Sequence, residues 1–315
     1  DPTIRALRQR PCRSEAVRAA VPNKNTTQRL LLDEPMSAHT SWRVGGPVDM
    51  FYQPDSIQDL VTFLSGHDPD HEIHWVGLGS NLLVRDGGIR GVVICTLDLP
   101  GRIERVDERH VQVGAGVPCT VLARQCARWK LGPAVFFAGI PGTLGGALVM
   151  NAGAFGGETW DVVASVKTID RKGVLRTRTI DDFKVAYRSV VGATDEWFLG
   201  ATLELNSDSD ASLSSITALM RERGSSQPLG KRSCGSVFRN PPNEFAAQLI
   251  EAAGLKGMRF GDAVVSEKHA NFIINTGSAR AEDIESLIEQ VRDRVEADSG
   301  IALELEVRIL GERLS

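Results

Sequence analysis

The sequence has no apolar run long enough to cross a membrane, and its first residues, although basic, lack the apolar centre of a signal peptide. We therefore expect no membrane insertion. Residues 1–25 are expected to form a loose or amphipathic N-terminal arm.

Paired cysteine spacing is also missing. The five cysteines are odd in number and form no CxxC pair, which argues against a disulfide framework and against structural zinc. His269 has no second histidine or carboxylate at ligand spacing, and the other histidines are scattered, so we expect no metal site. A reducing compartment is the simplest location, and we expect a cytoplasmic protein.

The chain has no strong excess of charge of either sign. A net charge of −4 gives no general attraction to nucleic acid or to an anionic membrane. With 315 residues, 42% of them hydrophobic, the chain is long enough for two or three globular domains. We therefore expect a protein that binds no nucleic acid, and we expect a monomer, with an oligomer as the alternative.

Glycine, in contrast, is concentrated in two segments. Seven glycines lie in residues 139–157, and a second glycine-rich turn occupies residues 77–88 after a strand-like run. Glycine lets backbone amides turn toward an anion, so the second turn can form a nest for a pyrophosphate. In a Rossmann fold such a turn opens a helix, whereas here it enters the strand-like LLVRDGGIRGVVI. The pattern predicts a pyrophosphate held between strands, with the longer glycine loop free to pass along a flat ring system.

The first half of the chain alternates between strand and helix patterns. Residues 48–76 predict a strand–helix–strand unit whose helix is capped by Asp55 and Gln58. Several short strand-like runs follow, around one helix expected from Pro118 to Gly132.

The second half predicts three helices and a final strand. A helix is expected near residues 211–223, followed by one that Asn243 caps and that stops at Gly254. An amphipathic helix with one apolar face covers residues 284–295. The final strand alternates strictly between apolar and charged residues.

Several polar residues indicate little chemistry when taken alone. Glu304, Glu306 and Arg308 share one face of the final strand, most simply a solvated face. Ser236 lies in a glycine-flanked turn that is not the GxSxG elbow of a hydrolase. The adjacent pair Tyr187 and Arg188 is most often a surface contact.

Taken together, seven segments resemble the UDP-N-acetylenolpyruvoylglucosamine reductase family, from about residue 40 to residue 312. In order they are TSWRVGGPVD, GLGSNLLVRDGG, AGIPGTLGGALVMNAGAFG, the pair Tyr187 and Arg188, CGSVFRNPP, LKGMRFGDAVVSEKHANFIIN and ELEVRILGE. Each is a weak signal alone, but their order is specific. The chain resembles the shorter type, which lacks an inserted tyrosine loop.

The resemblance implies an α+β fold: a two-domain FAD-binding module of the vanillyl-alcohol-oxidase (PCMH) type and a C-terminal α/β substrate-binding domain. The implied ranges are the arm at 1–25, FAD-binding subdomain 1 at 26–82 completed by 303–315, FAD-binding subdomain 2 at 83–206, and the substrate-binding domain at 207–302.

The resemblance also implies residue roles. The catalytic residues would be Arg188, Ser236 and Glu306. FAD contacts would come from Arg43, Gly45, Gly77, Gly79, Ser80, Asn81, Leu82, Ile140, Pro141, Gly142, Gly145, Gly146, Ala147, Asn151 and Gly153. Substrate contacts would come from Tyr187, Arg223, Gln227, Asn240, Lys268, His269 and Asn271.

The implied reaction uses noncovalent FAD and NADPH as hydride donor. It reduces the enolpyruvyl group of UDP-N-acetylglucosamine enolpyruvate to give UDP-N-acetylmuramate, a step of peptidoglycan precursor synthesis. Arg188 and Glu306 would stabilise charge on the substrate carboxylate, and Ser236 would protonate the α-carbon.

Two other functions remain open from sequence. An oxidase of the same fold often holds its flavin covalently through His or Cys, but neither glycine segment contains one. A non-catalytic nucleotide-sugar-binding protein would be expected to lose one of the three catalytic residues, and all three are present.

Overall fold

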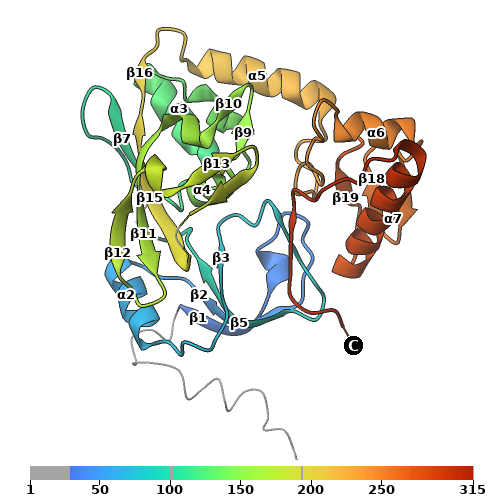
Figure 1. The fold of residues 1–315 in the computed structure, drawn as a ribbon, viewed down its shortest axis with the longest axis horizontal. Helices are drawn as coiled ribbons and strands as arrows, with labels where there is room; N and C mark the ends of the chain where they lie inside the picture. Colours follow the sequence, from blue (N-terminus) through green and yellow to red (C-terminus); the bar gives the residue numbers. More distant parts are fainter. Residues whose placement is uncertain (1–28, 100–101, 193, 315) are drawn as a thin grey trace, which may run out of the picture.

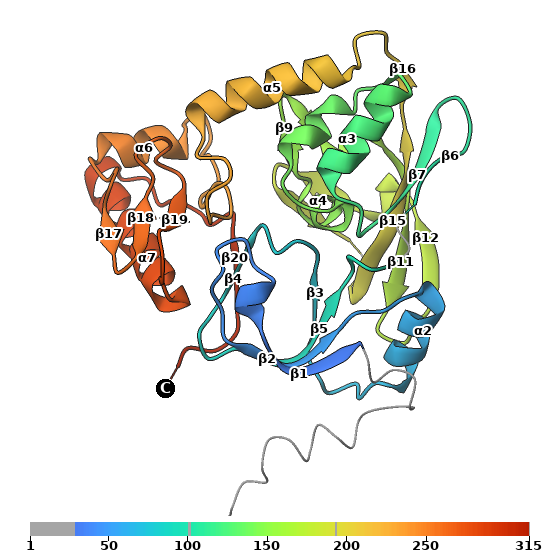
Figure 2. The same ribbon diagram turned by 180° about the vertical axis from the view of Figure 1, so that it is seen from behind.

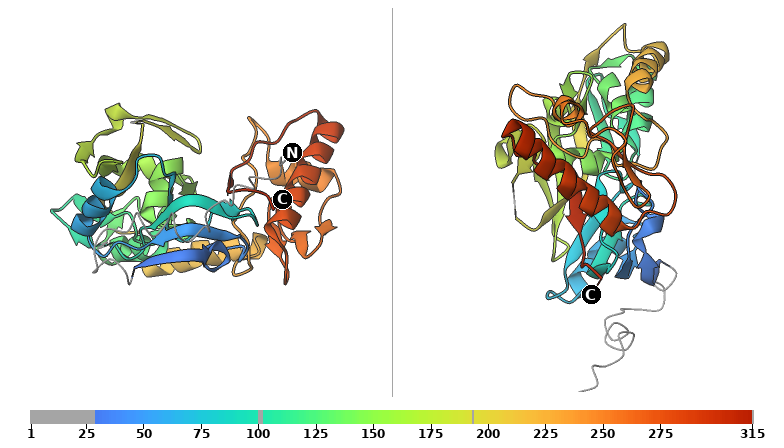
Figure 3. Two further views of the ribbon diagram at one scale, coloured as in Figure 1. Left: turned by 90° about the horizontal axis from the view of Figure 1, so that it is seen from below. Right: turned by 90° about the vertical axis from the view of Figure 1, so that its right-hand side faces the viewer.

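The structure is a computed structural model that describes residues 29–99, 102–192 and 194–314. The expected arm at residues 1–25, and Cys12 within it, lie outside the described residues. The described chain forms three parts, each with a sheet, and Figure 3 shows the C-terminal part as a separate lobe beside the other two.

The first part is built on a sheet with strand order β1-β2-β5-β3. Its strands are β1 (Leu30–Pro35), β2 (Pro47–Tyr52), β3 (Ile73–Val76) and β5 (Ile89–Cys95). β5 runs parallel to both β2 and β3, and it carries a nearly continuous buried run because it is central. Helix α2 (Ile57–Gly66) lies between β2 and β3 in sequence, as predicted.

The predicted cap of α2 is wrong by one residue. Ser56, not Asp55, is the N-cap, because its hydroxyl accepts the Asp59 backbone N–H at 3.0 Å. Asp59 in turn accepts the N–H of Asp55 at 3.2 Å.

The glycine turn that begins at Gly77 enters a strand, as predicted. This strand, β4 (Leu82–Val84), pairs in parallel with β20 (Arg308–Leu310) from the end of the chain. That pairing supports completion of the first subdomain by residues 303–315. The expected boundary at 82/83 does not match the sheet, since β5 belongs to the first sheet. We propose a boundary after Cys95.

The second part is an antiparallel sheet of order β12-β11-β15-β7-β6 (Figure 2). Its strands are β6 (Ile103–Arg105), β7 (His110–Gly114), β11 (Val163–Asp170), β12 (Leu175–Arg178) and β15 (Glu196–Glu204). Helices α3 (Cys119–Arg128) and α4 (Leu144–Met150) bury their apolar residues in the same core as this sheet. The pairs β9 (Gly153–Ala154) with β10 (Gly157–Glu158) and β13 (Lys184–Ala186) with β14 (Ser189–Val191) form two small hairpins.

Helix α3 ends four residues earlier than predicted. Lys130 has a φ of 56°, a left-handed conformation that a helix does not continue through. Leu131–Gly132 instead form β8, which pairs with β16 (Asn206–Ser207).

The C-terminal part packs α6 (Ala246–Ala252) and α7 (Ala281–Ser299) against a three-stranded sheet. The strands are β17 (Arg259–Phe260), β18 (Ala263–Val265) and β19 (Ile273–Asn275). The apolar face predicted for residues 284–295 is confirmed: the buried residues of α7 include Ile284, Leu287, Ile288, Val291 and Val295. Helix α5 (Leu213–Ser226) spans from the second part to this lobe (Figures 1 and 2).

The predicted cap of α6 is also wrong. Asn243 has a φ of 63° and precedes the helix, whereas the Asn240 side-chain oxygen accepts the Ala246 N–H at 3.1 Å. The helix ends before Gly254, as predicted.

Side chains of the first part complete the core of the C-terminal lobe. Trp42 is fully buried among the apolar residues of the lobe, and its indole N–H donates to the carbonyl of Ile273 at 2.8 Å. Asp86, in the glycine turn, accepts the N–H groups of Ala281 and Glu282 at 3.0 and 2.9 Å. A residue of the first part therefore caps α7.

Candidate active site

A cavity of about 550 Å³ lies where the three parts meet. Its walls include both glycine segments and the side chains of Arg188, Ser236 and Glu306. The three residues expected to be catalytic come from segments far apart in sequence, and the fold brings all of them to one cavity.

Arg188 is held in a strained two-residue turn between β13 and β14. Ala186 pairs with Ser189 across this turn, and Arg188 has a φ of 52°, which non-glycine residues rarely adopt. Its guanidinium donates to Glu306 Oε1 at 3.2 Å and to the carbonyl of Gly153 at 3.2 Å. The Tyr187 ring lies 4.9 Å from the guanidinium carbon.

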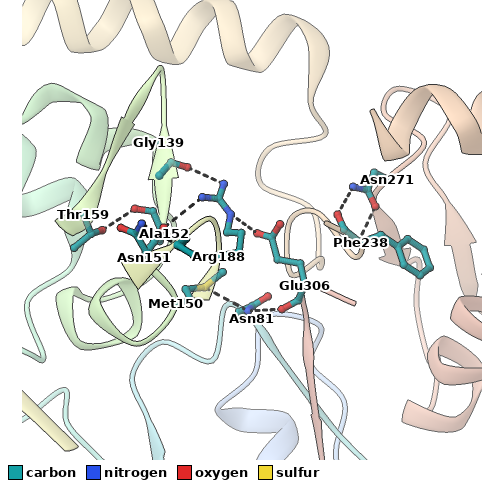
Figure 4. A network of polar contacts seen from close by, with 12 residues as sticks. Asn81, Gly139, Met150, Asn151, Ala152, Thr159, Arg188, Phe238, Asn271 and Glu306 are labelled. Atoms are coloured by element: carbon teal, nitrogen blue, oxygen red, sulfur yellow. Dashed lines mark hydrogen bonds and ion pairs between the residues drawn. The ribbon is translucent and has the colours of Figure 1, made fainter. Parts of the chain in front are cut away.

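Glu306 is not solvated, so the alternation-based prediction is wrong for this residue. Its side chain is 15% exposed, against 79% for Glu304. Regular strand pairing starts only at Arg308, and Arg188 covers the carboxylate (Figure 4). Burial raises the pKa of Glu306, and the Arg188 cation opposes that rise.

Ser236 is placed by a turn that Asn271 holds. Gly235, the preceding residue, has a φ of 76°, which suits glycine. The Asn271 amide accepts the N–H of Phe238 at 2.9 Å and donates to the carbonyl of the same residue at 2.8 Å (Figure 4). The Asn271 carbonyl accepts the N–H of Val237 at 2.9 Å. Asn271 thus fixes the backbone on one side of Ser236.

Most residues expected to contact FAD line this cavity. They are Gly77, Gly79, Ser80, Asn81, Leu82, Ile140, Pro141, Gly142, Gly145, Gly146, Ala147 and Gly153. The longer glycine segment is not a continuous loop as expected, because it contains α4, capped by Thr143.

The glycines leave space that side chains would fill. A Cβ at Gly142 would lie 3.2 Å from Ser80 Oγ, in the gap between the two glycine segments. At Gly79, with a φ of 59°, a Cβ would lie 1.9 Å from the carbonyl oxygen of His39, so this glycine is required by the fold itself. The cavity walls fit a flat, phosphate-bearing cofactor.

Three of the expected FAD contacts lie outside the cavity lining. Arg43 donates to the carbonyl of Ala38 at 2.8 Å, and a Cβ at Gly45 would lie 2.9 Å from Val84 Cβ. Asn151 is buried, and its amide binds Glu158 and the N–H of Trp160 at 2.7 and 3.0 Å. Each of the three residues thus has contacts within the protein, and its contact with FAD stays a prediction.

Some residues expected to contact substrate gather between α5 and the C-terminal lobe. Arg223 lines the cavity, donates to the carbonyl of Gly139 and binds the Gln227 side chain at 2.6 Å. Lys268 donates to the carbonyl of Gly224, next to Arg223. Burial and the Arg223 charge lower the pKa of His269.

Three further residues are expected to contact substrate. Tyr187 is 46% exposed beside Arg188. Asn240 caps α6 and Asn271 holds the turn at Ser236, so both amides already have partners within the protein.

Comparison with known proteins identifies the family. Residues 227–310 match the model for the UDP-N-acetylenolpyruvoylglucosamine reductase C-terminal domain, and residues 48–178 match the model for an FAD binding domain. The reductase of Alkalilimnicola ehrlichii is 56% identical over 285 residues, which are 90% of this chain and 95% of the relative. That of Methylococcus capsulatus is 54% identical, covering 95% and 98%. The chain belongs to the UDP-N-acetylenolpyruvoylglucosamine reductase family.

The expected fold of this reductase family member is confirmed. The crystal structure of the reductase from Thermus caldophilus superposes with a TM-score of 0.76 at 31% identity, covering 90% of this chain and 98% of that one. Together with the FAD-binding match, this supports a PCMH-type module followed by the reductase C-terminal domain.

Sequence reasoning missed several residues of the cavity in this member of the reductase family. Arg308 lines it beside Glu306, although the alternation placed both on a solvated face. Glu196 lines another part of the wall, where its carboxylate binds Arg178 at 2.6 Å. Trp75 and Trp197 stack there with ring centroids 5.2 Å apart. No local motif marks these residues. Trp75 and Trp197 come from two different sheets, so packing between distant segments brings them together.

Residues 29–99, 102–192 and 194–314 contain neither a candidate metal site nor a membrane-spanning helix. They contain no group of three His, Cys, Asp or Glu side chains placed to hold a metal ion. None of their helices combines the length and apolar character needed to span a membrane.

Proposed function

We propose that this protein catalyses the NADPH-dependent, FAD-mediated reduction of UDP-N-acetylglucosamine enolpyruvate to UDP-N-acetylmuramate in peptidoglycan precursor synthesis. One observation carries the proposal: Arg188, Ser236 and Glu306 line the same cavity as both glycine segments. Family membership supports the same reaction, since the relatives bear the name of this reductase.

The cofactor would occupy the space between the two glycine segments. Backbone amides around Gly79 and Ser80 would hold its pyrophosphate, and the segment from Ile140 to Gly146 would border its ring system. When bound, FAD supplies the redox chemistry by accepting hydride from NADPH and passing hydride to the enolpyruvyl double bond.

Arg188 and Glu306 would bind and stabilise the substrate carboxylate as negative charge develops on it. The 3.2 Å contact between them orients both side chains before substrate arrives. Because burial raises the pKa of Glu306, its carboxyl would hold a proton more readily than an exposed carboxyl and would donate a hydrogen bond to the substrate carboxylate.

Ser236 would supply the proton that completes the reduction. Addition of hydride to one carbon of the double bond leaves the α-carbon electron-rich, and this carbon is basic enough to take a proton from a hydroxyl. The turn held by Asn271 would present the hydroxyl to the cavity.

Cys95, Cys119, Cys126 and Cys234 are free and buried, which is consistent with the expected cytoplasmic location. The two-residue turn carrying Tyr187 is consistent with the shorter family type.

The deciding experiment measures NADPH oxidation by the purified holoenzyme. Oxidation should require enolpyruvyl-UDP-N-acetylglucosamine and yield UDP-N-acetylmuramate. Rapid NADPH oxidation with oxygen alone, unchanged by this substrate, would instead indicate an oxidase.

A further inference from the structure

The side chain of Asn81 contacts the strand that carries Glu306. Its amide N–H₂ donates to the backbone carbonyl of Glu306 at 3.0 Å, and it also approaches Met150 Sδ at 3.5 Å (Figure 4). The resemblance alone assigned Asn81 to the cofactor. Its side-chain donor instead binds the backbone of the segment that leads into β20.

The backbone around Glu306 is held from two sides. On one side, Asn81 binds the Glu306 carbonyl through its side chain and accepts the Arg308 N–H at 3.1 Å through its own carbonyl. On the other side, the Glu306 N–H donates to the carbonyl of Val237 at 2.8 Å, in the turn of Ser236.

Among the residues that the structure describes, Arg188 is the ionic partner of the Glu306 side chain, at 3.2 Å. Regular strand pairing begins only at Arg308, so the strand ladder does not hold the backbone of residue 306. The position of this backbone decides whether the Glu306 side chain reaches Arg188. Asn81 supplies the side-chain hydrogen bond that fixes this backbone at the point where β20 has not yet begun.

We propose that Asn81 is a positioning residue, which holds the Glu306 backbone so that the Glu306 carboxyl group meets Arg188 and the substrate. This inference rests on the proposed function. It assigns Asn81 a role in the substrate half-reaction that is separate from cofactor binding.

The test compares four FAD-loaded enzymes: wild type, Asn81→Ala, Glu306→Gln and the double variant. Each is assayed separately for flavin reduction by NADPH and for reoxidation by enolpyruvyl-UDP-N-acetylglucosamine. Asn81→Ala should slow reoxidation by about 10-fold, since small displacements of a catalytic group cost this much or more, and should leave flavin reduction within about twofold. In the Glu306→Gln background, Asn81→Ala should slow reoxidation by less than about twofold further. The effects of two substitutions are not additive when one residue acts through the other.

Two further variants distinguish loss of the Asn81 side-chain donor from a general disturbance of the glycine turn. Asn81→Asp keeps the size of the side chain but loses the donor, so it should slow reoxidation at least as much as Asn81→Ala. Ser80→Ala changes the neighbouring cavity residue, and any loss it causes should add fully to that of Glu306→Gln. Amide hydrogen exchange should accelerate at residues 304–310 in Asn81→Ala, and not in α7.

The outcomes are distinguishable. Additive losses for Asn81→Ala and Glu306→Gln, equal slowing of both half-reactions, or loss of FAD would overturn the positioning role. Wild-type reoxidation in Glu306→Gln itself would instead refute the proposed role of Glu306. An inactive wild type would refute the proposed function, and the exchange experiment would still report whether Asn81 holds the strand.

Discussion

At the scale of single residues, the environment decides what identical side chains do. Glu304 and Glu306 differ by two positions, yet one is 79% exposed and the other is covered by an arginine 118 positions earlier in the chain. Their sequence context cannot distinguish them, because the burial arises from a contact between distant segments.

This difference makes the two glutamates a matched pair for mutagenesis. Glu306→Gln should lower substrate-dependent turnover by about 100-fold, the scale of losing a preorganised electrostatic group. Glu304→Gln should change little, as is usual for an exposed side chain. Steady-state NADPH oxidation measures both; equal activities would show that Glu306 has no catalytic role.

The pH dependence follows from the raised pKa of Glu306. The Glu306 carboxyl keeps its proton to higher pH in the folded state than in the unfolded state. The free energy of unfolding therefore falls as pH rises above the ordinary pKa of glutamate, and it stops falling once Glu306 also ionises in the folded state. If the protonated carboxyl is the working form, reoxidation should slow as pH rises through the folded pKa. Glu306→Gln should lose this dependence.

Ser236 offers a separation of the half-reactions. Ser236→Ala should leave flavin reduction by NADPH nearly intact and slow reoxidation by about 100-fold or more, as expected for loss of a general acid. Ser236→Cys, which keeps a proton donor, should retain more activity. Rapid-mixing absorbance of the flavin measures both steps, and equal loss in both would indicate a folding role for the turn.

At the scale of elements, helix α7 depends on a cap from another part of the chain. Asp86 accepts the N–H groups of Ala281 and Glu282, and its neighbour Arg85 binds Glu285 at 2.9 Å. The glycine turn therefore connects to the C-terminal lobe as well as bordering the cavity.

Removing this cap should destabilise the protein measurably. Asp86→Ala should cost about 1 kcal/mol, the usual value for a lost helix N-cap. Asp293→Ala, at an exposed position of the same helix, is the control and should have little effect. Urea denaturation of both variants measures the difference, and similar midpoints would show that Asp86 does not stabilise α7.

The space between the two glycine segments can be filled by a single substitution at Gly142. Gly142→Leu should fold, because a Cβ there approaches only Ser80 Oγ, but it should lose FAD as the side chain fills the space between the segments. Absorbance of the purified protein near 450 nm, with circular dichroism as the folding control, measures this. A yellow, active variant would place the cofactor elsewhere.

At the scale of the whole molecule, sequence predicted the local features and missed those set by distant pairing. The turn entering β4 and the apolar face of α7 were predictable, because glycine content and helical period are local signals. The place of β5 in the first sheet and the burial of Glu306 were not, because each depends on segments brought together by the fold. The three catalytic candidates were predictable only from the family resemblance, because each lies in a short segment whose order along the chain is typical of the family.

The whole fold also bears on how FAD is attached. Neither glycine segment contains a His or Cys, but the assembled cavity includes Cys234 and His74 in its lining. Burial raises the pKa of the Cys234 thiol to about 12, so the thiolate needed for attack on a flavin is scarce at neutral pH. His74 instead has its Nε2 atom 3.6 Å from the carboxylate of Glu72.

We therefore expect noncovalent FAD in spite of these two residues. Acid precipitation should release all the flavin into the supernatant, and free FAD at about 100 times its dissociation constant should stabilise the apoprotein by about 2.7 kcal/mol. Absorbance of the two fractions and thermal unfolding measure the two effects. Yellow colour remaining in the pellet would contradict the expectation. Loss of that colour in His74→Ala or in Cys234→Ala would then identify the attachment site. Such a site would lie outside both glycine segments, so only the assembled cavity could reveal it.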